Sequence, residues 1–214
     1  MTFISRRDLL KSAIAAGAIA RAADGVAFPV MREVDAQPAA LGTLTAEEGA
    51  TLGAVVARLI PSDALGPGAK EAGAISYIDR ALGGALSASR AAYTSGLAAL
   101  DRYAQSSRGK AFVELLPADQ DSVLIDVETG AATGFSGSAA AFFAMVLGHT
   151  HQGTFGDPYY GGNKDFAGWD LVGYPGVRTM VTNTDQKALE SRQLTPNHKS
   201  AYDYDSFTKA DRDH

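Results

Sequence analysis

The sequence contains no cysteine among its 214 residues. Disulfides, zinc–thiolate sites, iron–sulfur clusters and covalently attached c-type haem are excluded together, because each requires cysteine side chains. A basic excess is also missing, since 19 lysines and arginines stand against 24 aspartates and glutamates and the net charge is -5. Such a chain offers no basic stripe to neutralise phosphates, which argues against a nucleic-acid-binding protein. Any redox chemistry must therefore reside in a bound cofactor or in a partner chain.

The amino-terminal region has a short apolar run but not one long enough to cross a membrane. The run covers Ser12–Ala20, and so few residues cannot span roughly 30 Å of hydrocarbon. The residues before it read S-R-R-x-L-L-K and include Arg6 and Arg7, the pattern of a twin-arginine export signal; a small-x-small cleavage pattern ends the run. We therefore expect residues 1–23 to be a twin-arginine signal peptide and the mature protein to be periplasmic.

The next part of the chain shows helical spacing of apolar residues and no convincing alternating strand pattern. Residues 24–43 are rich in alanine, proline and glycine and are interpreted as a linker. Thr45 and Glu48 form a capping-box pattern in front of the first helix, and Pro61 ends that helix. Pro117 stands at the permitted first turn of a later helix. The helices are predicted at about 45–60, 69–82, 87–106, from 117 onward and at 138–149, with a short helical turn at 110–115.

After His151 the composition changes. The residues up to Gly176 are dense in glycine, proline and aromatics, so we expect an ordered loop held by its rings rather than a helix. Residues 179–214 are polar and charged, with isolated apolar residues that cannot bury much surface. They form either a disordered tail or an arm that folds onto something else. The predicted fold is all-α: a compact bundle of five to six helices within a domain at 44–178, then the loop and an extended C-terminal arm at 179–214.

Several short blocks stand in order along the chain. The most specific is D-P-x-Y-G-G-N…G-W…G-Y-P-G, which runs from Asp157 to Gly176. The others are L-T-x-x-E at 44–48, L-I-P-S-D at 59–63, G-P-G-A at 66–69, A-G at 72–73, Y-I-D at 77–79, F-F at 142–143, His149 and Gly153. Together these blocks resemble the gluconate 2-dehydrogenase subunit 3 family over about Leu44 to Val177.

The resemblance implies a role without catalysis by this chain. Members of the family are small subunits of membrane-associated periplasmic sugar, sugar acid or polyol dehydrogenases. Their large subunit is an FAD-containing oxidoreductase of the glucose–methanol–choline type, and a multihaem cytochrome c with c-type haem often completes the complex. The small subunit is similar to a chaperone that stabilises the flavoprotein and escorts it through the twin-arginine translocon. The resemblance therefore implies no cofactor in this chain and FAD in its partner.

The candidate site residues are chosen for a partner interface. Large rings give contact area at low entropy cost, so the sequence predicts an interface that contains Asp157, Tyr159, Tyr160, Asn163, Trp169 and Tyr174. A purely internal structural role for this loop is the alternative. His149, His151 and Asp157 could suggest a metal, but residues two apart on a helix point to different sides. No metal site is predicted, and His149 is expected to cap the end of its helix.

Two other sites are not supported by the residues. The loop has no phosphate-binding motif, and Gly66-Pro67-Gly68 needs no ligand as a turn before a helix. No serine or cysteine nucleophile stands in a recognisable elbow, so no catalytic residue is predicted. Two functions compete with an accessory subunit: a stand-alone periplasmic binding protein or enzyme that uses the loop as a pocket for a sugar or polyol, and a structural clamp whose export is provided elsewhere. The accessory subunit alone accounts for the export signal, the absent cofactor motifs and the matching blocks together.

Overall fold

The first described helix begins where the capping box predicts. A computed structural model describes residues 41–208, and helix α2 (Ala46–Leu59) opens it. The Thr45 hydroxyl accepts a hydrogen bond from the Glu48 amide at 3.2 Å, and the Glu48 carboxylate accepts one from the Thr45 amide at 2.9 Å. The helix ends at Leu59, just before Pro61. The signal peptide at 1–23 and almost all of the linker at 24–43 lie outside the described residues.

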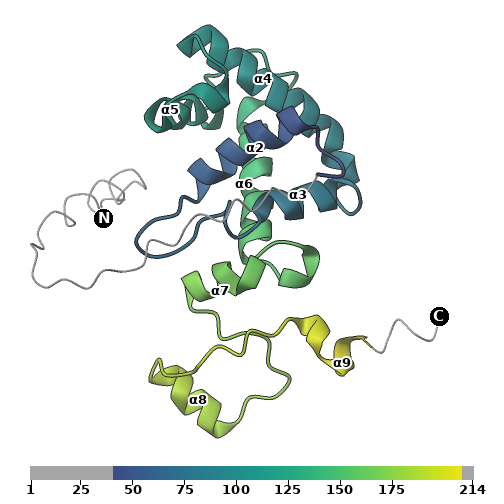
Figure 1. Cartoon of the computed structure of the whole chain (residues 1–214), viewed down its shortest axis with the longest axis vertical. Helices are drawn as coiled ribbons and strands as arrows, with labels where there is room; N and C mark the ends of the chain where they lie inside the picture. The colour runs from purple at the N-terminus through teal and green to yellow at the C-terminus, as the bar shows by residue number, and fades with distance from the viewer. Residues whose placement is uncertain (1–40, 209–214) are drawn as a thin grey trace, which may run out of the picture. The chain divides into compact units, whose positions relative to one another are not determined.

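The described residues contain helices and no β-strand, which confirms the all-α class. Helix labels follow Figure 1. After α2 the helices are α3 (Ala74–Leu82), α4 (Arg90–Arg108), α5 (Pro117–Glu128), α6 (Ala139–Phe155), α7 (Ala167–Val172), α8 (Asn183–Glu190) and α9 (Asp205–Thr208). Short 3₁₀ turns lie at Ser87–Ser89, Phe112–Glu114, Pro158–Tyr160, Lys164–Phe166 and Ala201–Asp203. No helix within residues 41–208 is long and apolar enough to cross a membrane.

Two predicted boundaries are wrong. Helix α3 starts at Ala74 rather than Ala69, because Gly73 adopts the left-handed conformation with φ 77° and interrupts the helix there. Helix α6 continues to Phe155 instead of ending near His149. The hydroxyls of Thr150 and Thr154 donate to carbonyls one turn earlier, each at 2.7 Å, so these buried polar groups are satisfied inside the continuing helix.

Helix α6 lies among α2, α3, α4 and α5 and packs against all four (Figure 1). It is apolar on most of its surface, as a helix surrounded by others must be. The helices α2–α6, called the bundle below, enclose one hydrophobic core. Its largest fully buried side chains are Tyr93, Phe112, Leu52, Ile78, Leu82, Leu97, Leu100, Val56, Val123, Val127 and Val146.

His149 lies within α6 and does not cap its end, so the predicted capping role is wrong. Its Nδ1 atom is 3.0 Å from the hydroxyl of Tyr93 on α4, and the two rings stack with an interplanar angle of 11°. Burial lowers the pKa of His149 and raises the pKa of Tyr93. Both groups are thus favoured in their neutral forms, which suits a polar contact at the edge of an apolar core.

Two carboxylates make polar contacts at the edge of the bundle: Asp79 joins the start of the described chain to α3, and Glu48 joins α2 to α4. Asp79 accepts hydrogen bonds from the amides of Gly42, Thr43 and Leu44 at 2.7–2.9 Å. Burial acts to raise the pKa of Asp79, but these bonds outweigh it and the pKa is lowered. Glu48 pairs with Arg90 at 2.7 Å, and hydrogen bonding to Arg90 lowers the pKa of Glu48 to about 2. Both carboxylates are therefore held in their charged forms.

Candidate functional site

The segment that follows α6, residues 156–178, is organised around Asn163. This side chain is completely buried. Its amide nitrogen donates to the Gly156 carbonyl at 2.8 Å, and its amide oxygen accepts from the Gly168 amide at 2.8 Å. Its backbone amide donates to the Gly153 carbonyl at 2.7 Å. One side chain thus joins the end of α6 to the start of α7, where a free helix N-terminus needs an acceptor.

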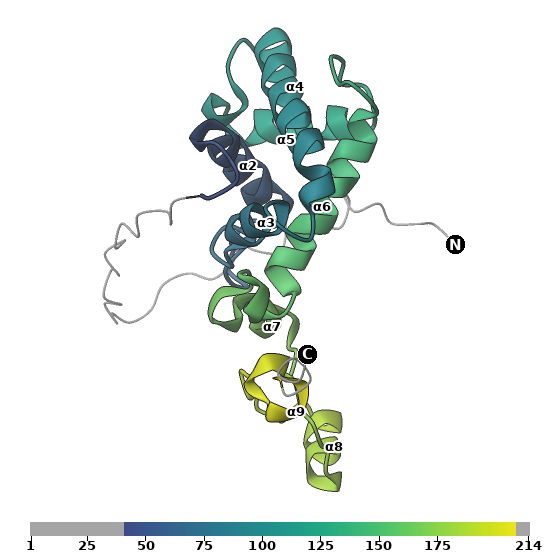
Figure 2. The ribbon, with the colours of Figure 1, turned by 90° about the vertical axis from the view of Figure 1, so that its right-hand side faces the viewer.

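Three glycines, Gly153 in α6 and Gly162 and Gly168 in the segment, let backbones approach closely. A Cβ atom at Gly153 would lie 2.8 Å from the Cα atom of Ala74 on α3. At Gly162 a Cβ atom would lie 2.1 Å from the Gly153 carbonyl oxygen, and at Gly168 it would lie 1.9 Å from the Thr154 carbonyl oxygen. No side chain fits at these distances. Gly153 therefore serves the contact between α6 and α3, while Gly162 and Gly168 serve the contact between the segment and the end of α6, which packs with α7 (Figure 2).

Trp169 holds α7 against α6 from inside. Its indole nitrogen donates to the Phe155 carbonyl at 2.9 Å, and the side chain is 6% exposed. Tyr174 packs against it in a T-shaped contact with ring centroids 4.7 Å apart. The sequence predicts a loop without a helix here; α7 shows that this part of the expectation is wrong. A helix of six residues is marginal on its own. This one is held by Asn163, which accepts from the Gly168 amide in its first turn, and by Trp169, which bonds to the end of α6.

Asp157 binds the C-terminal arm, here residues 179–208 of the predicted 179–214. Its carboxylate accepts from the Ser200 hydroxyl at 2.6 Å and from the Ala201 amide at 2.9 Å. The same carboxylate accepts from the Tyr159 amide at 2.9 Å. Of the two outcomes left open for the arm, folding onto something else is the one observed, and that something is the chain's own segment.

Three tyrosines lie together where the arm meets the segment. Tyr159 stacks on Tyr202 with centroids 3.6 Å apart, and the hydroxyls of Tyr160 and Tyr202 are 2.8 Å apart. Hydrogen bonding to Tyr160 raises the pKa of Tyr202 to about 12. Tyr159 and Tyr160 each remain 49% exposed. The arm therefore orders these rings without covering them.

A second set of contacts closes the arm around Gly176. A Cβ atom at Gly176, with φ 83°, would lie 1.9 Å from the Asn197 side-chain oxygen. The Asn197 amide nitrogen donates to the Val177 carbonyl at 2.7 Å. His198 lies 2.7 Å from the Asp170 carboxylate and stacks on Phe166. The arm is thus tied to both ends of the segment.

The structure divides the six predicted interface residues into two groups. Tyr159, Tyr160 and Tyr174 are exposed by 40–49% and can contact a partner directly. Asn163 and Trp169 are buried and shape the segment from within, while Asp157 holds the arm. These three side chains therefore have structural contacts within the chain, and the interface itself stays a prediction. Arg6 and Arg7 lie outside the described residues.

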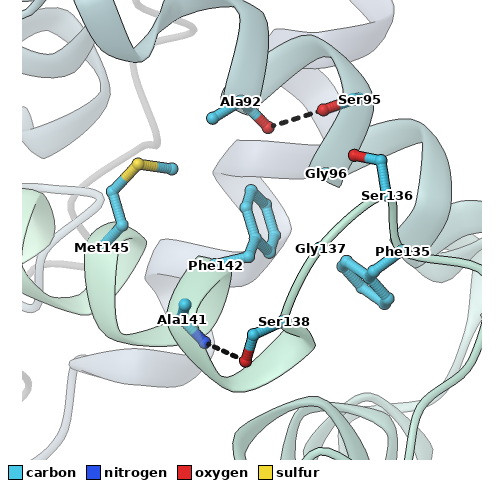
Figure 3. Close-up of a pocket in the computed structure, with 10 residues that line it drawn as sticks. All are labelled: Ala92, Ser95, Gly96, Phe135, Ser136, Gly137, Ser138, Ala141, Phe142 and Met145. Atoms are coloured by element: carbon cyan, nitrogen blue, oxygen red, sulfur yellow. Dashed lines mark hydrogen bonds between the residues drawn. The ribbon is translucent and has the colours of Figure 1, made fainter.

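Among residues 41–208 no three histidines or carboxylates cluster closely enough to hold a metal ion. A cavity of about 230 Å³ lies between α4 and the residues leading into α6 (Figure 3). The ring of Phe142 packs at Gly96, where a Cβ atom would lie 2.2 Å from it. The hydroxyl of Ser138 caps α6 by accepting from the Ala141 amide at 3.1 Å. None of the ten lining residues is charged, and the polar side chains among them are Ser95, Ser136 and Ser138.

The sequence-based prediction did not include the residues of the arm that bind the segment. Ser200 and Asp203 form a capping box, as do Thr182 and Asp185. Both have the S/T-x-x-D spacing that signals the start of a helical turn. That signal could have shown that the arm contains ordered turns. The pairing of Ser200 with Asp157, 43 residues earlier, has no local signal.

A comparison with protein-family models finds one family that covers the bundle and most of the segment. The family model described as "Gluconate 2-dehydrogenase subunit 3" matches residues 46–176. The match begins at the first residue of α2 and ends at Gly176, so it includes the bundle and the Asn163-centred segment but not the arm. No curated protein and no solved structure matches the chain. The chain belongs to the gluconate 2-dehydrogenase subunit 3 family.

Proposed function

We propose that the chain is a non-catalytic small subunit of a membrane-associated periplasmic dehydrogenase that oxidises a sugar, sugar acid or polyol. The large subunit would be an FAD-containing protein of the glucose–methanol–choline type, and a multihaem cytochrome c would be a third component. FAD and haem would then be held by the partners. Family membership supports a larger catalytic partner.

The observation that carries the proposal is the construction of the segment, residues 156–178. Tyr159, Tyr160 and Tyr174 are exposed, while Asn163 and Trp169 fix the backbone beneath them. Exposed aromatic side chains on a rigid backbone are typical of binding hot spots, because little conformational entropy remains to be lost on association. This supports contact with a protein partner through the segment.

Export forms the second part of the proposal. Arg6 and Arg7 would direct the chain to the twin-arginine translocon, which moves folded proteins. The small subunit would bind the flavoprotein in the cytoplasm, stabilise it and escort it across the membrane. The absence of recognisable cofactor motifs from a chain with such a signal supports this escort role.

Purification of the tagged full-length chain from its native host tests the complex. We expect a co-purifying subunit with flavin absorbance and a sugar- or polyol-dependent reduction of an artificial electron acceptor. The chain separated from that subunit should have neither property. A sugar that binds the isolated chain in calorimetry, with no flavoprotein in the purified material, would instead indicate a stand-alone binding protein.

Cell fractionation tests the export role. Changing Arg6→Lys together with Arg7→Lys should leave the large subunit in the cytoplasm or cause its degradation. Arg21→Lys is the matched control, because it makes the same chemical change outside the arginine pair. If the large subunit reaches the periplasm normally in the double variant, the escort role is wrong.

A further inference from the structure

The arm contains a loop, residues 179–196 and called the excursion below, whose two ends are joined by hydrogen bonds. Val177 and Arg178 stand at its start, and Thr195 and Asn197 stand at its end. The Arg178 guanidinium donates to the Thr195 carbonyl at 2.8 Å, and the Asn197 side chain donates to the Val177 carbonyl at 2.7 Å. The excursion therefore leaves and returns at one fixed place, directly after the segment that carries Tyr174.

The helix within this excursion, α8, is shaped by polar contacts alone. Thr182 and Asp185 form its capping box, with bonds of 3.0 and 3.2 Å between side chain and backbone. Arg178 approaches the Asp185 carboxylate to 3.8 Å and so links the helix to the joined ends. Hydrogen bonds from Thr182 lower the pKa of Asp185, which keeps the carboxylate charged for both contacts.

The excursion presents apolar side chains and buries none. No residue of 179–196 is buried. Met180 is 77% exposed, Val181 65% and Leu189 53%. An isolated helix of eight residues is marginal in water, since helices of this length depend on packing of an apolar face. The excursion therefore combines a capped helix with exposed apolar side chains before its start, Met180 and Val181, and near its end, Leu189. The contact that would stabilise it lies outside the described chain.

The charges of the excursion favour a protein surface over a lipid surface as its partner. Lys187 and Arg192 are balanced by Asp185 and Glu190. A helix that binds anionic lipid carries a basic polar face, which attracts the headgroups. A neutral excursion with few apolar side chains instead fits the groove of a protein that receives an amphipathic helix.

We propose that residues 179–196 form a docking finger that inserts α8 and its neighbours Met180 and Val181 into an apolar groove of the large dehydrogenase subunit. This inference rests on the proposed function, which supplies that subunit. The finger follows directly on the segment that carries the exposed Tyr174, and its two ends are held at Val177 and Arg178, so it starts beside the proposed interface. The finger lies beyond the residues matched by the family model and would give this chain contacts specific to its own partner.

A binding titration with two matched triple variants tests the finger. The flavin-containing subunit that co-purifies with the chain is titrated against the full-length wild type and against Met180→Ser/Val181→Ser/Leu189→Ser. The control variant is Leu65→Ser/Leu116→Ser/Ile125→Ser, three residues outside the finger that are exposed by 84%, 71% and 46%. Trp169 fluorescence and circular dichroism check that both variants are folded.

We expect Kd to rise at least tenfold for the finger variant and to stay within twofold for the control. Equal binding by the finger variant and the wild type overturns the finger while leaving the proposed function intact. Equal weakening by both triple variants also overturns it, because the loss would not be specific. A wild-type chain that binds no flavin-containing subunit overturns the proposed function and the finger with it.

Two further measurements test whether the finger binds a second copy of this chain or a lipid surface instead of the large subunit. If the wild type dimerises in sedimentation velocity and the finger variant does not, the finger is a contact between copies of this chain and the proposal is wrong. If vesicles of anionic phospholipid bind the wild type and not the finger variant, the partner is a lipid surface and the proposal is also wrong. Absence of both effects, together with the tenfold change in Kd, supports the docking finger.

Discussion

The bundle and the segment with its arm are built by different interactions. In the bundle, large apolar side chains such as Phe112, Leu52 and Ile78 are completely buried. In residues 156–208 only one large apolar side chain, Trp169, is buried, and order comes from side chains such as Asn163 and Asp157 that bond to the backbone. Apolar burial tolerates small adjustments, whereas hydrogen bonds depend on position and angle. The difference assigns stability to the bundle, and the proposed function adds recognition of a partner by the segment.

The largest expected effect is a cavity in the bundle. Phe112→Ala should lower the free energy of unfolding by about 3 to 5 kcal/mol, because a completely buried aromatic ring is removed. Val113→Ala, at a neighbouring residue that is 43% exposed, is the control and should cost under about 0.5 kcal/mol. Denaturant unfolding of the full chain gives both values. Similar losses in the two variants would contradict a bundle held by apolar burial.

Removal of the central side chain of the segment should have the next largest effect. Asn163→Ala leaves the Gly156 carbonyl and the Gly168 amide without their partner, at about 1 to 3 kcal/mol for each buried group left unsatisfied. The effect should be local, so Trp169 fluorescence should change at lower denaturant than circular dichroism of the bundle. Asn183→Ala, in exposed α8, should leave both transitions unchanged. Coincident transitions in Asn163→Ala would show that segment and bundle unfold as one unit.

Acid should weaken the bundle through Glu48. Its pKa is lowered to about 2 in the folded chain against 4.5 as its ordinary value, so its contribution is complete above pH 4.5 and is lost as pH falls toward 2. Allowing for solvent screening, the loss is about 1 to 2 kcal/mol. Glu48→Gln should remove this part of the pH dependence when unfolding is measured between about pH 2 and pH 5. An unchanged slope in that variant would contradict the role of the Arg90 pair.

The smallest expected effect is in the arm. Ser200→Ala removes the bond to Asp157 and the cap on the following turn, at about 1 kcal/mol. The free energy of global unfolding should not change, while amide hydrogen exchange in residues 197–204 should become faster. Ser206→Ala, in exposed α9, is the control and should leave that exchange unchanged. Exchange as slow as in the wild type would mean that the ring contacts alone hold the arm.

The difference between the two regions also explains what the sequence could predict. Apolar spacing and caps located the bundle helices, since both are local patterns. The predicted start of α3 is wrong because Gly73 is left-handed and interrupts the helix. The predicted end of α6 near His149 is wrong because the Thr150 and Thr154 hydroxyls bond within the continuing helix. In the segment, composition indicated order, but the left-handed Asn163 and the Asp157–Ser200 pair join distant residues. No periodicity records such contacts, so buried and exposed members of the predicted interface could not be separated.

Hydrogen exchange of the full-length chain, alone and in complex with the flavin-containing subunit, tests the central claim most directly. Binding through the segment and the docking finger predicts slower exchange at residues 157–160, 172–174 and 179–196. Exchange in the exposed parts of α4 and α5 should not change. Protection confined to those bundle helices, with the segment and the finger unaffected, would contradict the account.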